Sequence, residues 1–245
     1  MKIFGIVDIS TIDYPKMCSA VVFLSGCNML CGYCHNYEHM LDNTRNIDMS
    51  PKEVFDKIDL IFADALVISG GEPTLQPEGV KELCKLAKNE GLAVKLDTNG
   101  TSVDIVKDII DNKLIDYIAL DVKCGFDKYE KIARYNGSII KKNILEIINY
   151  CISNNVFIEC RTTVVPDLMD KQDIVEIAKT VKDCNLYAIQ QMDCHHSYTE
   201  EYQKMRHIKT DELMELGKIA EKYVGEDTSI IIRSNNEVFK VKTGK

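Results

Sequence analysis

Two kinds of segment alternate along the chain. Short runs rich in β-branched and apolar residues, about four to eight long, are typical of buried strands. Longer segments repeat an apolar residue every third or fourth position, as amphipathic helices do. The short runs predict strands at 18–25, 65–69, 92–97, 115–121, 156–165, 186–191 and 229–233. The longer segments predict helices at 51–62, 77–90, 102–112, 138–154, 170–182 and 210–224.

Helix-capping residues support two of these boundaries. Ser50 precedes Pro51 and is followed three positions later by Glu53, which is the pattern of a capping box. The helix at 77–90 begins at Pro77 and ends before Gly91, as proline and glycine preferences favour.

The alternation of strand and helix, without a long linker, predicts an α/β fold with parallel strands and right-handed crossovers. A doubly wound sheet and a full or partial barrel both satisfy this pattern. We expect one domain over residues 1–245, with a core at about 18–192. Residues 1–17 would form an N-terminal extension, and residues 205–245 a C-terminal helix and strand.

Composition limits the cellular compartment and the class of partner that we expect. The chain is 45% apolar, but no run of about 18 uncharged apolar residues predicts a membrane span. The first residues lack the long apolar region of a signal peptide, so we expect a cytoplasmic protein with reduced thiols. Its ten cysteines then indicate metal ligands or core residues. The net charge is −8 and no basic block is present, so nucleic acid is not an expected partner.

Polar motifs follow the predicted strands at the point where each ends. Parallel α/β sheets and barrels place their sites at the carboxyl ends of strands, so these motifs predict a functional rim. The motifs are the cysteine loop after 18–25, Ser69-Gly70-Gly71-Glu72-Pro73-Thr74, Asp97-Thr98-Asn99-Gly100, Asp121-Val122-Lys123, Arg161 within its strand, and Gln190-Gln191.

The most informative motif is the cysteine loop, in which Cys27, Cys31 and Cys34 have the spacing C-x3-C-x2-C. Three thiolates can hold three irons of a 4Fe–4S cluster and leave the fourth open to a ligand. A zinc site would need a fourth ligand such as His35 or His39. Haem attachment through C-x-x-C-H would require export and would leave Cys27 unexplained.

The glycine motif and the carboxylates have both structural and functional interpretations. Gly70 and Gly71 either end a strand or allow a ligand close to the backbone, where Glu72 could accept hydrogen bonds from an ammonium group. Asp97 and Asp121 either cap helices or bind a cation or polar ligand groups.

Two cations belong to the same rim. Lys123 lies two residues beyond Asp121 and so points to the same side of the strand, although it could also be a surface lysine. Arg161 lies in an apolar strand and needs an anionic partner, for which a ligand carboxylate is one candidate. The remaining cysteines show no cluster spacing and are expected in the core, and Cys194-His195-His196 is expected to be a polar loop.

Taken together, Cys27-x3-Cys31-x2-Cys34 and Gly70-Gly71-Glu72-Pro73 resemble the radical S-adenosylmethionine (SAM) superfamily. The resemblance is closer to its glycyl-radical-enzyme activating proteins, and within them to the activating proteins of anaerobic ribonucleoside-triphosphate reductase. It covers residues 5–165 well and the remainder loosely. Further matching segments are Thr11–Pro15, Ala20–Asn28, Cys34–Asn36, Lys95–Gly100 and Asp116–Lys123.

The resemblance implies a partial (β/α)6 TIM-like barrel and one 4Fe–4S cluster whose open iron is chelated by SAM. The reduced cluster would cleave SAM to a 5′-deoxyadenosyl radical, which takes an α-hydrogen from a glycine of a partner enzyme. The partner would be a glycyl-radical enzyme, for which the resemblance implies anaerobic ribonucleotide reductase, and flavodoxin or ferredoxin would donate the electron.

The resemblance also implies the roles of individual residues. Cys27, Cys31 and Cys34 would be the metal ligands. The cofactor-binding residues would be Tyr33, Cys34 and His35 at the adenine, and Gly70, Gly71 and Glu72 at the methionine amine. Four more, Asp97, Asn99, Asp121 and Lys123, would contact the methionine end or a monovalent cation. Arg161 would reach the carboxylate, and Gln191 would lie at the rim.

Two features of the sequence differ from those of particular subfamilies of activating enzymes. Pyruvate formate-lyase activating enzymes carry a histidine at the end of the sixth strand, where this chain has Gln191-Met192-Asp193. Residues 37–50 hold no second cysteine group, so one cluster is expected. A radical SAM enzyme acting on a small molecule or peptide, and a non-catalytic Fe–S or zinc protein, remain alternative interpretations at this point.

Overall fold

The structure is a computed structural model that describes residues 1–41, 46–235 and 237–245. The chain divides into two compact units. Unit 1 consists of residues 1–28, 36–119 and 154–156, and unit 2 of residues 29–35, 120–153 and 157–245. Among the described residues, no helix has the length and apolar character needed to cross a membrane.

Unit 1 contains a sheet in the strand order β3-β1-β2-β4-β5. Strands β2, β4 and β5 are parallel, whereas β1 pairs antiparallel with both β2 and β3. The strands are β1 Lys2–Ser10, β2 Ser19–Leu24, β3 Ile47–Asp48, β4 Ala65–Gly70 and β5 Ala93–Thr98. The helices are α1 Tyr37–Leu41, α2 Pro51–Asp56, η2 Pro73–Leu75, α3 Pro77–Asn89 and α4 Val103–Asp111.

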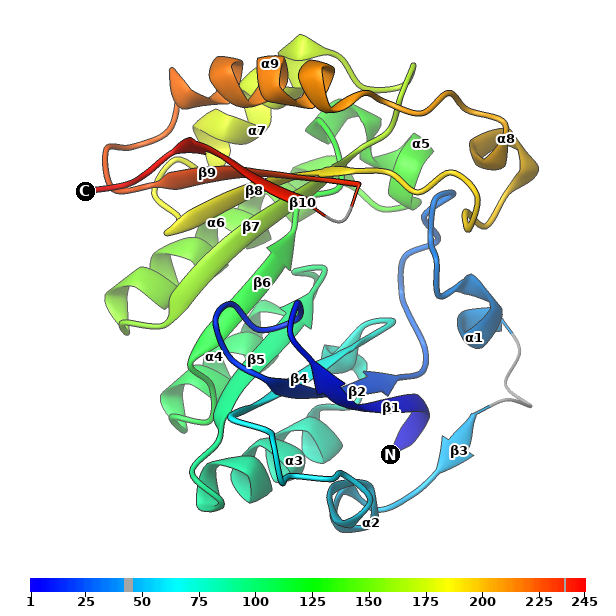
Figure 1. Cartoon of the computed structure of the whole chain (residues 1–245), viewed down its shortest axis with the longest axis vertical. Helices are drawn as coiled ribbons and strands as arrows, with labels where there is room; N and C mark the ends of the chain where they lie inside the picture. Colours follow the sequence, from blue (N-terminus) through cyan, green and yellow to red (C-terminus); the bar gives the residue numbers. More distant parts are fainter. Residues whose placement is uncertain (42–45, 236) are drawn as a thin grey trace. The chain divides into compact units, whose positions relative to one another are not determined.

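Unit 2 contains the parallel strands β7, β8 and β9, with β10 antiparallel to β9 (Figure 1). Helix α9 packs against β8, β9 and β10 and against α7. The strands are β7 Phe157–Val164, β8 Leu186–Gln191, β9 Ser229–Ser234 and β10 Glu237–Lys242. The helices are η3 Phe126–Lys128, α5 Tyr129–Ala133, α6 Gly137–Ser153, α7 Lys171–Thr180, α8 Glu200–Gln203 and α9 Thr210–Glu221. Strand β6, Tyr117–Asp121, contributes residues to both units.

Every predicted strand is present, and the helices at 77–90, 102–112, 138–154, 170–182 and 210–224 are confirmed within a few residues. The interior of β4 is fully buried from Ala65 to Ile68, as expected of a parallel strand covered on both faces. The Ser50–Glu53 capping box is also confirmed, because the Ser50 amide donates to Glu53 Oε2 at 2.8 Å and the Glu53 amide donates to Ser50 Oγ at 3.2 Å.

The helix predicted at 51–62 is wrong in its length, because α2 ends at Asp56. Continuing the helix would send the amide of Ile61 back to the carbonyl of Lys57. Instead it donates to Asp59 Oδ1 at 3.0 Å, and the Asp59 amide donates to Asp8 Oδ1 at 3.1 Å. Aspartate competes with the helix for backbone donors in this way.

Strands β1 and β10 were not predicted. In β1 the buried and exposed positions do not alternate, and its pairing with β2 contains register shifts. Strand β10 is a charged edge strand whose Val238 is 61% exposed. Neither segment therefore carries the period-two pattern that reveals a half-buried strand.

Candidate functional site

The cysteine loop begins at Ser25, directly after β2, and has no regular secondary structure between residues 25 and 36. None of the ten cysteines, all of which lie within the described residues, forms a disulfide; Cys27 and Cys34 are partly exposed while Cys31 is buried. The side-chain amide of Asn99 donates to Cys27 Sγ at 3.9 Å. The loop therefore offers reduced thiols, two of which are accessible.

The end of β4 in unit 1 requires glycine. Gly70 has φ +126°, and a Cβ atom there would lie 2.2 Å from the carbonyl oxygen of Leu24. The next amide, that of Gly71, donates to the same oxygen at 2.9 Å. The Asn36 side chain donates to the Gly70 carbonyl at 3.2 Å. The two glycines thus bring the 70–72 turn against the end of β2, where the cysteine loop starts.

Glu72 is completely buried, and both of its oxygens are engaged by the chain. Oε1 accepts from the Thr74 amide at 3.0 Å, from the Thr74 hydroxyl at 2.5 Å and from the Thr98 hydroxyl at 2.9 Å, and Oε2 accepts from the Asn99 amide at 2.6 Å. Burial raises the pKa of Glu72, although these hydrogen bonds oppose the rise. The carboxylate joins the turn after β4 to the turn after β5.

Asp97 also has partners within unit 1. Its Oδ1 lies 3.0 Å from Lys95 Nζ, and its Oδ2 accepts from the Ser69 hydroxyl at 2.9 Å. Lys95 is only 3% exposed and also donates to the carbonyl of Asp13 at 2.7 Å. The next polar residue, Asn99, donates to Asn28 Oδ1 at 2.9 Å and so connects the β5 end to the cysteine loop.

In unit 2, Asp121 at the end of β6 forms two ion pairs. Its Oδ1 lies 2.7 Å from Arg161 Nε and its Oδ2 lies 2.8 Å from Lys123 Nζ. Burial would raise the pKa of Asp121, but the Arg161 and Lys123 cations outweigh it and hold that pKa below its usual value. The anionic partner that the sequence demanded for Arg161 is therefore present in the chain itself.

Tyr33 and His35 flank Cys34 in unit 2. Tyr33 is 8% exposed, and its hydroxyl is a buried polar atom without a hydrogen-bond partner among the described residues. Burial is the main reason that the pKa of Tyr33 is raised. His35 is exposed, and its Nε2 lies 3.3 Å from the carbonyl oxygen of Asp193.

Gln191, at the end of β8, uses both ends of its side-chain amide within unit 2. Its nitrogen donates to the Ile208 carbonyl at 2.7 Å and its oxygen accepts from the Asn235 amide at 3.0 Å. Beyond it, Cys194 is buried and donates to the Arg206 carbonyl at 3.7 Å, while His196 Nδ1 lies 2.7 Å from Asp193 Oδ2. These contacts fit the polar loop expected from the sequence.

Several residues in these contacts were given no role of their own in the sequence analysis, although all but Tyr129 lie within motifs or segments named there. They are Asn28, Ser69, Lys95, Thr98 and Tyr129, the last of which accepts a hydrogen bond from the Lys123 amide at 2.8 Å. Lys95 carried one usable signal, because a lysine inside an apolar strand requires a buried anion.

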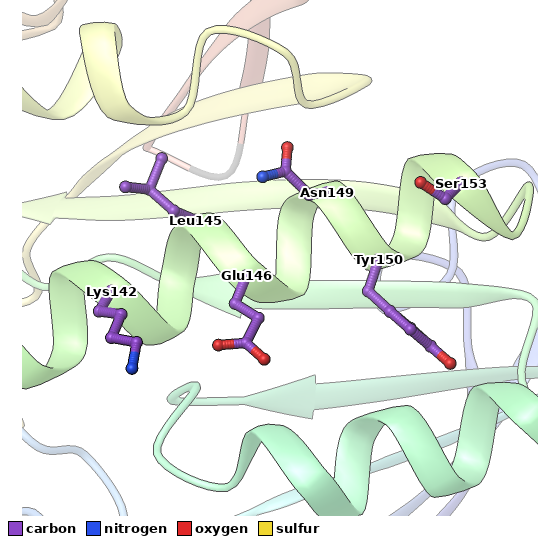
Figure 2. A pocket seen from close by; sticks show the side chains of 6 residues that line it. All are labelled: Lys142, Leu145, Glu146, Asn149, Tyr150 and Ser153. Carbon is purple, nitrogen blue, oxygen red and sulfur yellow. The ribbon is translucent and has the colours of Figure 1, made fainter.

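A shallow hollow of about 380 Å³ lies elsewhere, on helix α6. Figure 2 shows its lining side chains spread along that single helix: Lys142, Leu145, Glu146, Asn149, Tyr150 and Ser153. None of the predicted site residues is among them. This hollow therefore does not change the assignment of the site.

The donor set fits an iron–sulfur cluster. Within the described residues, no three His, Cys, Asp or Glu side chains converge as they would on a single metal ion. In a 4Fe–4S cube, however, each thiolate binds a different iron, so the thiols need not converge on one point. Three reduced thiols on one irregular loop satisfy that requirement.

Comparison with known proteins gives a consistent result. Residues 21–184 match the model of the radical SAM superfamily. A Methanocaldococcus jannaschii protein that is named as a glycyl-radical enzyme activating enzyme is 55% identical over 97% of this chain and 98% of its own length. The pyruvate formate-lyase-activating enzyme of Clostridium pasteurianum is 28% identical over 83% of this chain and 86% of its own.

A solved structure supports the fold. A domain of pyruvate-formate lyase-activating enzyme from Bacteroides vulgatus has a TM-score of 0.52 and 17% identity, over 69% of this chain and 99% of that one. The predicted fold class, a partial barrel of parallel strands in an open α/β arrangement, is confirmed.

Proposed function

This chain belongs to the radical SAM superfamily and to its glycyl-radical enzyme activating enzymes, and from that premise we propose that its partner is an anaerobic ribonucleotide reductase. The observation that carries the activation of a glycyl-radical enzyme is the relative with 55% identity over almost the whole chain, whose name specifies that activation but no partner. The family implies a 4Fe–4S cluster and SAM as cofactors.

The metal ligands that we propose are Cys27, Cys31 and Cys34. When bound, the cluster and SAM supply the one-electron cleavage that yields a 5′-deoxyadenosyl radical. The chain itself contributes orientation. The amide of Asn99 donates to the Cys27 sulfur, and the Asn99 backbone is in turn held by Glu72. Hydrogen bonds to cluster sulfurs are one of the means by which proteins tune such clusters.

For SAM we propose contacts from the residues that the sequence resemblance assigns to it. The exposed edges of Gly70 and Gly71 would face the methionine amine, while Glu72 acts indirectly by holding the 72–74 and 98–99 turns. Tyr33 and His35 would lie along the adenine, although the Tyr33 hydroxyl is buried and has no hydrogen-bond partner among the described residues. Asp97, Asn99 and Gln191 would contribute indirectly, by fixing the strand ends through the ion pair and hydrogen bonds described above.

The ion pairs bear on the remaining assignments. The single negative charge of Asp121 is shared between Arg161 and Lys123, whereas Asp97 forms an ion pair with Lys95. We therefore propose that Arg161 and Lys123 present a net positive charge to the SAM carboxylate. A monovalent cation beside Asp97 and Asp121 stays a prediction, and these pairs would weaken its binding.

The choice of reductase over pyruvate formate-lyase rests on the sequence Gln191-Met192-Asp193 at the end of β8. Gln191 there joins the end of β8 to residues 208 and 235 through its amide. Flavodoxin or ferredoxin is the proposed electron donor. We also propose that the chain forms a single domain and that the protein is cytoplasmic.

Electron paramagnetic resonance tests the partner. The reconstituted, reduced protein is incubated with SAM and with the anaerobic ribonucleotide reductase of the same organism, and in parallel with a pyruvate formate-lyase. We expect a glycyl-radical signal on the reductase that its Gly→Ala variant lacks. A signal on the lyase alone would transfer the proposal to that enzyme.

A further inference from the structure

The segment between β8 and α9 contacts the cysteine loop within unit 2. The amide of Thr199 donates to the carbonyl of Gly32 at 3.2 Å. His35 Nε2 lies 3.3 Å from the carbonyl oxygen of Asp193. Two points of this segment, six residues apart, therefore reach the stretch of the loop that contains Cys31 and Cys34.

The closest of these contacts joins Gly32 to Tyr202 of α8. A Cβ atom on Gly32 would lie 2.2 Å from Cε2 of Tyr202 and 2.6 Å from its Cδ2 and Cζ. A side chain at position 32 would fit only if the ring moved, because real Cβ contacts are essentially never shorter than 3.0 Å. The Tyr202 ring is 5% exposed, and its centroid lies 6.3 Å from that of Tyr33. The ring thus occupies the place that a side chain at position 32 would take.

The opposite side of the same loop is held by α5. The Leu30 amide donates to the carbonyl of Ala133 at 3.1 Å, and the Gly32 amide donates to the carbonyl of Ile132 at 3.4 Å. The Gly32 residue is consequently held from both sides, through its N–H by α5 and through its C=O by Thr199. The turn that follows is closed by a bond from the Cys34 amide to the Cys31 carbonyl at 3.1 Å.

We propose that Tyr202 is a positioning residue for the cluster, acting through Gly32 to fix the backbone that carries Cys31 and Cys34. This inference rests on the proposed role of the cysteines as ligands. Tyr202 stands 170 residues after Gly32 in the sequence, outside the segment that matches the superfamily model. Its contribution is the ring and not the hydroxyl, since the atoms nearest to Gly32 are ring carbons.

The cost of losing this contact follows from the burial of the ring. Truncating a buried aromatic side chain removes apolar packing. A tenfold change in an equilibrium corresponds to a free-energy change of about 1.4 kcal/mol. We expect Tyr202→Leu to release iron to a chelator about tenfold faster than the wild type under anaerobic conditions. Tyr202→Phe keeps the ring and should retain the wild-type release rate. Tyr187→Leu, in which a fully buried tyrosine of β8 in the same unit is replaced, is the matched control.

A double-mutant cycle tests the contact itself. Gly32→Ala alone introduces the methyl group that collides with the Tyr202 ring, so it should also accelerate iron release. In Gly32→Ala combined with Tyr202→Leu the methyl group gains room, and the combined acceleration should be smaller than the product of the two single effects. The reduced cluster's paramagnetic spectrum provides a second readout, which should shift in both single variants and return toward wild type in the double variant.

The outcomes separate this proposal from the proposed function. If Tyr202→Leu and Gly32→Ala release iron at the wild-type rate, or if their effects multiply independently, Tyr202 has no positioning role. If the variant lacking Cys27, Cys31 and Cys34 still binds a full cluster, the ligand assignment fails first. Loss of iron from Tyr202→Leu that is matched by Tyr187→Leu would show general destabilisation and would also overturn the proposal.

Discussion

Arg161 Nε donates to Asp121 Oδ1 at 2.7 Å, which joins the middle of β7 to the end of β6 across 40 residues of sequence. The same carboxylate lies 2.8 Å from Lys123 Nζ. All three side chains are at most one-quarter exposed. The group carries a net positive charge on the rim of unit 2, and that charge is held in place by the chain before any ligand binds.

Asp121→Asn should destabilise the protein in a pH-dependent way. The pKa of Asp121 is lowered in the folded state, so its stabilisation is present above the unfolded value of about 3.9 and is lost as the pH falls through the folded value. Removing one partner of a partly buried ion pair costs up to roughly 3 kcal/mol. Urea unfolding at several pH values measures the difference from wild type, which should be largest near neutrality and shrink in acid.

The matched control for this experiment is Asp56→Asn, because Asp56 is 56% exposed and pairs with Lys52 four residues earlier. It should change the free energy of unfolding by well under about 1 kcal/mol. A difference between wild type and Asp121→Asn that stays constant from neutral pH into acid would contradict the ion-pair interpretation.

Glu72→Gln should also lower the free energy of unfolding. An amide nitrogen cannot accept the hydrogen bond from the Asn99 backbone, so one buried donor loses its partner. An unsatisfied buried group costs about 1–3 kcal/mol. Chemical denaturation of the cluster-free full chain measures this loss. Glu78→Gln, at a position 86% exposed, should be neutral, and equal stability of the two variants would remove Glu72 from its bridging role.

Gly70→Ala and Gly91→Ala separate steric collision from backbone strain. Both glycines have positive φ, but a Cβ at Gly70 meets the Leu24 backbone at 2.2 Å while one at Gly91 meets no atom within 4 Å. Gly91→Ala should cost only about 1 kcal/mol, which is the conformational penalty. Gly70→Ala should cost several times as much, or prevent folding, in thermal unfolding experiments. Equal melting temperatures for the two variants would argue against close approach of the strand ends.

Replacing Cys27, Cys31 and Cys34 together by alanine should abolish the cluster. The wild-type chain, reconstituted anaerobically, should bind about four irons, as one cube requires. Iron and sulfide analysis should find almost none in the triple variant. Cys18→Ala, which removes a partly exposed thiol outside the loop, should retain the full count. A triple variant that keeps its iron would show that the ligands lie elsewhere.

The elements that were predictable are those whose pattern is local. Continuous apolar runs revealed β2 and β4, the Ser50–Glu53 pair marked the start of α2, and the strand ends located the rim. Strand β1 could not be predicted, because its burial does not alternate and its place depends on the register with β2.

The partners of the candidate site residues were less predictable than the positions of these residues at the strand ends. The sequence indicated that Glu72 and Arg161 belong at the rim, but their partners Thr98, Asn99 and Asp121 follow from tertiary structure. Likewise, nothing in the sequence connects Gly32 with Tyr202. A glycine leaves a space, and only the fold determines which distant side chain fills it.

The central claim is that this chain removes a hydrogen atom from a glycine of a partner protein, and isotope transfer tests it most directly. The reduced protein is incubated with SAM and with anaerobic ribonucleotide reductase deuterated at its glycine α-carbons. Mass spectrometry then measures deuterium in the 5′-deoxyadenosine that is released. We predict that deuterium appears in this product, and that a reductase whose radical-site glycine is replaced by alanine yields unlabelled 5′-deoxyadenosine. Unlabelled product with the intact reductase and with every other glycyl-radical enzyme tried, together with label transfer from a deuterated metabolite or peptide, would contradict the account.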